Sequence, residues 1–326
     1  MGRTAFVTGA DGFVGLNLTK ELLKHGWQVF AFCLPACTSP HLEEMRVTIL
    51  RGDITDKQSL LTAFPEHVDA VFHLAADTSL RSSENKKQNK VNVLGTRNVV
   101  EVALEKKAGR FIHMSSVAVF GFHERHIHEQ TPSNVYNSNI NYFKSKALAE
   151  EEVLRGINNG LDAVILSPGN IIGPYDTSGW AQIFIKIKED QFSGIGNGGG
   201  SFCHVFEVAK VMREAVDKGK TGERYVLGGE DASFHELAVK TQQLIGGNVP
   251  DKPVSSAMMH LLSWIVIFFC TLRGKTPFLT PEIATLSSNW LCVDATKAEQ
   301  ELGYRKHSLE EMIQDSYQWL SSQNIC

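Results

Sequence analysis

The amino-acid sequence predicts an α/β fold, with a doubly wound parallel sheet followed by a smaller, mainly helical C-terminal lobe. Strand-forming and helix-forming segments alternate six times over residues 1–174, and small or polar residues gather where the strands end. The composition, 43% hydrophobic and 21% charged, is typical of a globular protein. We therefore expect one large domain over residues 1–174 and a second lobe over residues 175–326, of which residues 204–228 pack back on the first domain.

Composition and charge exclude several classes of protein. Lys and Arg total 32 against 36 Asp and Glu, and this net charge of −4 offers no concentrated basic surface for nucleic acid. The six cysteines form no C-x-x-C pair, and His123, His126 and His128 fit no standard metal spacing. We expect reduced thiols, a cytoplasmic protein without a secretory leader, and no metal site. The three histidines are expected in a solvated loop.

The first element is a strand over residues 4–8 that runs into three glycines spaced three apart. Gly9 permits a tight turn, Gly12 lets the backbone approach a pyrophosphate, and Gly15 allows a helix to pack closely on the strand. A helical pattern follows at once, and its N-terminus attracts an anion. Strand, glycine turn and helix together predict a dinucleotide-binding unit of the Rossmann type; the alternative is a purely structural turn.

The second strand, residues 28–33, ends at Leu34. An acidic residue about 20 residues beyond the glycines often holds the ribose hydroxyls of NAD, whereas an arginine favours the 2′-phosphate of NADP. Neither stands here, so these residues do not distinguish NAD from NADP.

The third strand, residues 47–51, leads to Asp53 and Ile54, and the fourth, residues 69–73, leads to Leu74-Ala75-Ala76. Asp53 is positioned to accept from an adenine amino group or to cap the next helix. Small residues after a strand suit the close passage of a cofactor. A long helix is expected over residues 89–107, with Asn92 near its start.

The fifth and sixth strands, residues 110–114 and 161–166, bring the candidate catalytic residues to the same edge of the sheet. Ser116 follows the fifth strand. A helix over residues 141–154 precedes the sixth strand and carries Tyr142 and Lys146 on one face, four residues apart.

The ordinary tyrosine pKa is near 10, and a nearby ammonium lowers it by favouring the phenolate. Tyr142 and Lys146 can therefore exchange a proton with a carbonyl or alcohol oxygen, while Ser116 hydrogen-bonds that oxygen. The alternative is a solvated Tyr–Lys pair, which is common on helices.

The C-terminal lobe is less regular. We expect a flexible loop over residues 194–200, helices over 206–218 and 233–245, and a strand over 225–227. Thr280 and Ser308 stand where helix N-caps are expected. The apolar run 258–272, which includes Trp264 and Phe268, is shorter than the roughly 20 residues that span a bilayer. It is expected to form the wall of a hydrophobic pocket, with a core helix or a membrane contact as alternatives.

Taken together, these motifs resemble the extended short-chain dehydrogenase/reductase superfamily over nearly the whole chain. Within it, the chain looks most similar to the dihydroflavonol-reductase-like and 3β-hydroxysteroid-dehydrogenase-like branch. The motifs that carry the resemblance are residues 8–15, 52–54, 73–76, 92–96, 115–116, 142–146, 168–170, 203–205 and 225–229. They are specific for the superfamily and not for a substrate.

The resemblance implies a Ser116-Tyr142-Lys146 catalytic set and a nicotinamide cofactor. Cofactor contacts are implied for Gly9, Asp11, Gly12, Phe13, Val14, Gly15, Leu34, Asp53, Ile54, Leu74, Ala75, Ala76, Asn92, Tyr142, Lys146, Pro168, Asn170 and Ile171. Many NADP-dependent members of the branch carry arginine where Leu34 stands, so the usual cofactor signal is missing; the habit of the family favours NADP(H) over NAD(H).

The expected function is NAD(P)H-dependent reduction of a ketone or aldehyde on a hydrophobic small molecule, or the reverse oxidation. A nucleotide-sugar epimerase or dehydratase with tightly bound NAD uses the same catalytic residues and is the main alternative. Few cations stand near residues 183–203 to hold a diphosphate. A non-catalytic dinucleotide sensor is the third possibility. A homodimer is expected by analogy with the superfamily.

Overall fold

The computed structural model describes residues 2–326, and its main feature is a seven-stranded sheet whose neighbouring strands are all parallel. The strand order is β3-β2-β1-β4-β5-β6-β9, so the direction of winding reverses beside β1. The strands are β1 (Thr4–Thr8), β2 (Gln28–Cys33), β3 (Thr48–Arg51), β4 (Ala70–His73), β5 (Arg110–Met114), β6 (Ala163–Pro168) and β9 (Arg224–Leu227). The predicted doubly wound α/β fold is confirmed.

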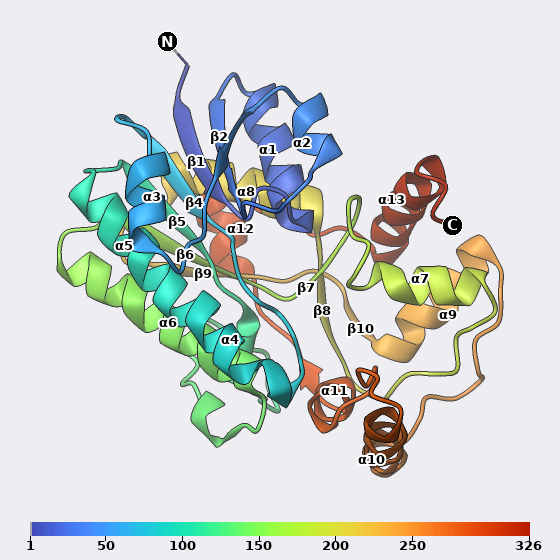
Figure 1. Cartoon of the computed structure of the whole chain (residues 1–326). Helices are drawn as coiled ribbons and strands as arrows, with labels where there is room; N and C mark the ends of the chain where they lie inside the picture. Colours follow the sequence, from blue (N-terminus) through green and yellow to red (C-terminus); the bar gives the residue numbers. More distant parts are fainter. Residues whose placement is uncertain (1) are drawn as a thin grey trace.

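Helices cover both faces of this sheet (Figure 1). Apolar side chains of one face pack against α1 (Phe13–Lys24), α2 (Pro40–Glu44), α8 (Val205–Lys218) and α12 (Thr296–Leu302). The opposite face packs against α3 (Lys57–Ala63), α5 (Thr96–Glu105) and α6 (Asn141–Asn158). The sheet is therefore buried on both sides, as its runs of branched apolar residues require.

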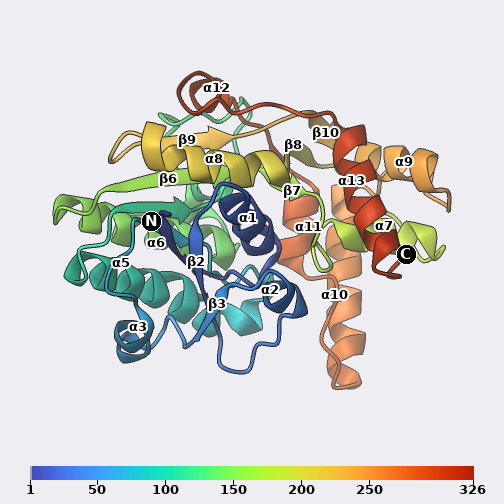
Figure 2. The same ribbon diagram turned by 90° about the horizontal axis from the view of Figure 1, so that it is seen from above.

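The C-terminal lobe is built on a small second sheet. Its strands are β7 (Asn170–Ile172), β8 (Gly199–His204), β10 (Asp231–Ser233) and β11 (Trp290–Leu291). A separate apolar cluster packs β8 against α7 (Ala181–Lys188), α9 (Phe234–Ile245) and α13 (Leu309–Ser322). Helix α10 (Ser256–Leu272) projects from the body of the molecule (Figure 2), and helix α11 (Pro281–Ser287) packs against it.

Two predictions about local structure are wrong. Residues 199–200 of the predicted flexible loop belong to the buried strand β8. A Cβ atom on Gly200 would lie 2.7 Å from the Leu291 carbonyl oxygen, so these glycines serve the close approach of neighbouring strands.

The predicted helix over residues 89–107 is divided. It consists of α4 (Asn85–Asn89), a π-helical turn (Lys90–Gly95) and α5. Such turns occur frequently at functional sites.

The predicted caps of the C-terminal helices are confirmed. The Thr280 side chain accepts a hydrogen bond from the Ile283 N–H, and Ser308 forms a capping box with Glu311. Among residues 2–326, no helix is long and apolar enough to cross a bilayer.

Candidate active site

The glycine turn between β1 and α1 has the geometry that its sequence predicts. Gly9 adopts φ 68°, a left-handed conformation that favours glycine. A Cβ atom at Gly9 would lie 2.8 Å from the Ala75 backbone nitrogen, and one at Gly15 would collide with the Gly9 carbonyl oxygen. The small residues after β4 therefore pass directly against the turn.

The N-terminus of α1 can receive an anion. Gly12 is its N-cap residue, and no side chain among the described residues caps this end. A Cβ atom at Gly12 would meet only the Gly9 carbonyl oxygen, at 3.3 Å, so the other side of Gly12 is open. The first backbone N–H groups of the helix are thus available to a pyrophosphate, as expected for a dinucleotide site.

A cavity of about 440 Å³ lies beside this turn, at the ends of the first four strands. Half of the residues proposed to contact the cofactor line it, namely Gly9, Asp11, Gly12, Leu34, Asp53, Ile54, Leu74, Ala75 and Ala76. Asp53 also accepts a hydrogen bond from the Thr55 N–H, whereas Asp56 caps α3. The adjoining Phe13, Val14 and Gly15 form the first turn of α1.

The other proposed cofactor residues lie outside this cavity. Asn92 is buried in the π-helical turn; its amide donates to the Asp77 carbonyl oxygen and to Ser145 Oγ, both at 2.9 Å. It therefore ties the segment after β4 to α6. Pro168 ends β6, and Asn170 and Ile171 begin β7, where the Asn170 amide donates to the Ser201 carbonyl oxygen at 3.3 Å.

Arg51 is a cation that contacts the loop after β2 and that sequence reasoning did not consider. It ends β3 opposite Cys33 of β2, and its guanidinium donates to the Cys37 carbonyl oxygen at 2.5 Å and the Leu34 carbonyl oxygen at 3.4 Å. Parallel pairing thus brings an arginine to the loop after β2, although the sequence of that loop contains none. The sequence holds no local signal for it, because the place of Arg51 depends on the register of β3 against β2.

Tyr142, Lys146 and Ser116 converge where β5 ends and α6 begins. Tyr142 and Lys146 lie one turn apart on α6, and Ser116 is close enough to the Tyr142 hydroxyl to lower its pKa. Lys146 is buried, and its ammonium donates to the Met114 carbonyl oxygen at 2.7 Å. The structure therefore brings the three proposed catalytic residues together.

Burial dominates the proton affinities of this site. It raises the pKa of Tyr142, while the neighbouring Ser116 hydroxyl lowers it in part. The Lys146 ammonium was expected to lower the pKa of Tyr142, but it is not among the groups that shift this pKa. Burial lowers the pKa of Lys146 to about 8, against an opposing effect of the Glu150 carboxylate.

Glu150 extends the catalytic face of α6 by one more turn. It is 3% exposed, accepts hydrogen bonds from Ser115 Oγ and Arg224 Nη2, and contributes to the charge balance of Lys146. Burial raises the pKa of Glu150, and the Arg224 guanidinium opposes this shift most strongly. Glu150 was not predicted, although its spacing of four residues from Lys146 places both on one helix face.

Two buried histidines lie beside Lys146 and are neutral. Burial, with Lys146, lowers the pKa of His73 to about 3 and that of His113 well below its ordinary value. His73 bridges Thr8 and Thr96 at 2.7 and 2.9 Å. Since Thr96 donates its own proton to the Asn92 carbonyl oxygen, His73 carries its proton on Nε2. These histidines support the strands and do not compete with Lys146 as cations.

A second cavity, of about 840 Å³, lies in the C-terminal lobe between α7, α10 and α11. Its lining is mainly apolar and includes Trp180, Ile183, Phe192, Leu262, Val266, Phe278, Leu279, Ile283 and Leu286. The run 258–272 therefore contributes to a pocket wall. Trp264 and Phe268, however, point away from the cavity and are 63% and 60% exposed.

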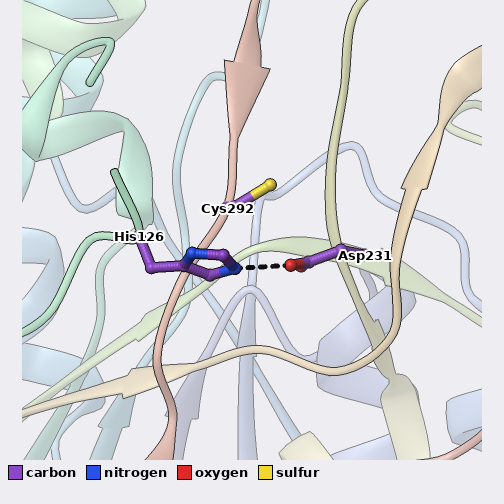
Figure 3. Close-up of side chains that lie close together, drawn as sticks. All are labelled: His126, Asp231 and Cys292. Carbon is purple, nitrogen blue, oxygen red and sulfur yellow. Dashed lines mark hydrogen bonds and ion pairs between the residues drawn. The ribbon is translucent and has the colours of Figure 1, made fainter. Parts of the chain in front are cut away.

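The histidine-rich loop contains one further cluster. Figure 3 shows His126, Asp231 and Cys292 meeting from three separate segments, with possible ligand atoms within 4.8 Å of one another. His126 Nε2 and Asp231 Oδ2 are hydrogen-bonded at 2.7 Å, and His126 is exposed, as expected for this loop. Burial raises the pKa of the Cys292 thiol to about 11, so the thiol is protonated at neutral pH. The absence of a metal from this protein stays a prediction.

Comparison with known proteins supports the same interpretation. A family model described as "NAD dependent epimerase/dehydratase family" matches residues 5–228. A Synechocystis sp. protein provisionally named dihydroflavonol 4-reductase is 30% identical, over 97% of this chain and 94% of its own length. Sterol demethylase protein B of Methylococcus capsulatus is 26% identical, over 99% of both chains. The crystal structure of gox2253 superposes with a TM-score of 0.86 at 28% identity, over 99% of both chains.

Proposed function

Because the chain belongs to the NAD dependent epimerase/dehydratase family, we propose that it reduces a ketone or aldehyde to an alcohol with NAD(P)H, or catalyses the reverse oxidation. The observation that carries this proposal is the convergence of Ser116, the Tyr142 hydroxyl and the buried Lys146 ammonium where β5 ends and α6 begins. The three groups combine a proton donor, a hydrogen-bond donor and a cation at one strand end. A reacting carbonyl needs these groups and a hydride source.

Each residue of the site has its own role in the proposed reaction. When bound, the nicotinamide supplies or accepts the hydride. Tyr142 gives its phenolic proton to the carbonyl oxygen as negative charge develops there, and Ser116 donates a hydrogen bond to the same oxygen. The Lys146 ammonium supplies a positive charge one helical turn from the phenolate that remains. In the direction of oxidation the same phenolate removes the alcohol proton.

The residues of the glycine turn would hold the dinucleotide. The open side of Gly12 and the uncapped N-terminus of α1 suit its pyrophosphate, and the cavity beside Leu34 and Asp53 suits its adenosine half. Arg51 favours NADP(H), because a guanidinium at the loop after β2 can pair with a 2′-phosphate. Lys87 and Lys90 line the same cavity and add positive charge.

A hydrophobic substrate is supported by the apolar cavity in the C-terminal lobe. Lys186 is the one residue of its lining that carries a full positive charge, whereas a nucleotide-sugar diphosphate needs several cations. The names of several relatives are consistent with apolar substrates; one, from Stenotrophomonas maltophilia, is 2-alkyl-3-oxoalkanoate reductase, 27% identical. We therefore prefer carbonyl reduction to sugar epimerisation.

The test is NADPH oxidation with ketones and aldehydes of increasing chain length. Each additional buried methylene is expected to improve kcat/KM by up to about 0.8 kcal/mol, or about fourfold. Val266→Ser, in the cavity wall, should flatten this dependence, while Leu244→Ser on the exposed side of α9 serves as the matched control. Equal rates along the series, or epimerisation of a UDP-sugar, would instead favour the epimerase.

A further inference from the structure

The outer face of α10 is apolar and exposed. Leu261, Trp264, Phe268 and Leu272 recur at helical spacing along it and are 55%, 63%, 60% and 67% exposed. Phe278, in the segment that follows, is 74% exposed. Single exposed apolar residues are ordinary, but a continuous stripe along a whole helix marks an interaction surface.

The inner face of the same helix lines the apolar cavity of the C-terminal lobe, which is proposed to hold the substrate. Met259, Leu262 and Val266 recur at the same spacing and line the cavity together with Phe278. One helix therefore separates an apolar pocket from an exposed apolar surface. Figure 2 shows α10 projecting from the body of the molecule, away from the main sheet.

The charges nearest to α10 are positive. Between Asp251 and Glu282 the sequence contains no further aspartate or glutamate. The cations of this stretch stand before and directly after the helix: Lys252, then Arg273 and Lys275, all of them exposed. An apolar helix face flanked by cations is complementary to a bilayer surface with anionic headgroups.

We infer that α10 docks the protein on an anionic lipid surface, with Leu261, Trp264, Phe268 and Leu272 in the acyl boundary. The helix lies in the interface and does not span it, in agreement with its length. Docking places the mouth of the cavity beside Phe278 at the lipid, so an apolar carbonyl compound enters from the bilayer without crossing water. This last step rests on the proposed function.

Vesicle binding tests the docking directly, without catalysis. Wild-type protein should co-sediment with vesicles that contain phosphatidylserine, and less with vesicles of phosphatidylcholine alone. Trp264→Ser/Phe268→Ser should abolish binding to both, whereas Leu244→Ser, at an exposed leucine on α9, should bind like wild type. Arg273→Gln/Lys275→Gln should weaken binding to the anionic vesicles about 30-fold, at about fivefold per cation, and leave the weak binding to phosphatidylcholine unchanged.

Light scattering and a carbonyl assay separate the remaining outcomes. Turnover of a short, water-soluble ketone should be the same in the α10 variants and in wild type, while turnover of a long ketone supplied in vesicles should fall. Equal vesicle binding by wild type and Trp264→Ser/Phe268→Ser would overturn the docking inference. So would a homodimer that this variant dissociates, because a second copy would then cover the stripe. Vesicle binding without turnover of any carbonyl would overturn the proposed function alone.

Discussion

Replacement of Glu150 by glutamine tests how the site keeps Lys146 charged. Burial alone lowers the pKa of Lys146, and the Glu150 carboxylate is the group that opposes it. Glutamine has the same shape; its single oxygen can accept from Arg224 while its amide NH2 donates to the Ser115 hydroxyl, so the substitution removes the charge with little change in packing. It therefore isolates the electrostatic role of Glu150.

The magnitude follows from Coulomb's law. Cβ atoms one helical turn apart are about 6 Å from each other; with this value as the separation of the two charges and an effective dielectric constant of about 20, the attraction is about 3 kcal/mol. This equals about two pKa units, so the pKa of Lys146 should fall from about 8 to about 6. At pH 7.5 the ammonium fraction would fall from about three quarters to about one in thirty.

The assay is the pH dependence of kcat/KM for carbonyl reduction. Tyr142 has a raised pKa and remains the acid throughout, so Lys146 sets the basic limb. Reduction should be supported below the pKa of Lys146 and lost above it. The limb should lie near pH 8 in wild type and move toward pH 6 in Glu150→Gln.

Glu151→Gln is the matched control, because the neighbouring Glu151 bonds Tyr136 at the surface and does not shift the pKa of Lys146. A thermal melt of each variant verifies that the fold is retained. If Glu150→Gln kept the wild-type basic limb, Glu150 would be neutral in the folded protein and the electrostatic reasoning would be refuted.

Four further substitutions test the proposed chemistry and cofactor. Tyr142→Phe should lower kcat at least 10²-fold with cofactor affinity retained, as seen by NADPH fluorescence; more than a tenth of the wild-type rate would mean that another group supplies the proton. Ser116→Ala should cost about 10²-fold in kcat, as the loss of one hydrogen bond to the developing oxyanion. Arg51→Ala should lower kcat/KM for NADPH about tenfold or more relative to NADH, and Leu34→Arg should shift the ratio the opposite way; an unchanged ratio in both variants would place the 2′-phosphate elsewhere.

Much of the fold was predictable because its signals are local. The strand over residues 4–8, its glycine turn and its helix are adjacent in sequence, and the alternation that follows permits few other topologies. The error at Gly199 and Gly200 has the opposite origin. Nothing nearby in sequence shows that Leu291 and Ala232 pass against these glycines, so a glycine-rich strand could not be distinguished from a loop.

The same contrast between local and distant signals applies to the functional site. Tyr142, Lys146 and Glu150 share one helix face, and this relation is contained in their spacing. The position of Arg51 depends on the register of β3 against β2. Arg224 lies 74 residues after Glu150 in the chain and reaches it because β9 pairs with β6 in the sheet. Sequence patterns identify which groups can do chemistry. The charges that tune those groups come from strands distant in sequence, and only the three-dimensional fold identifies them.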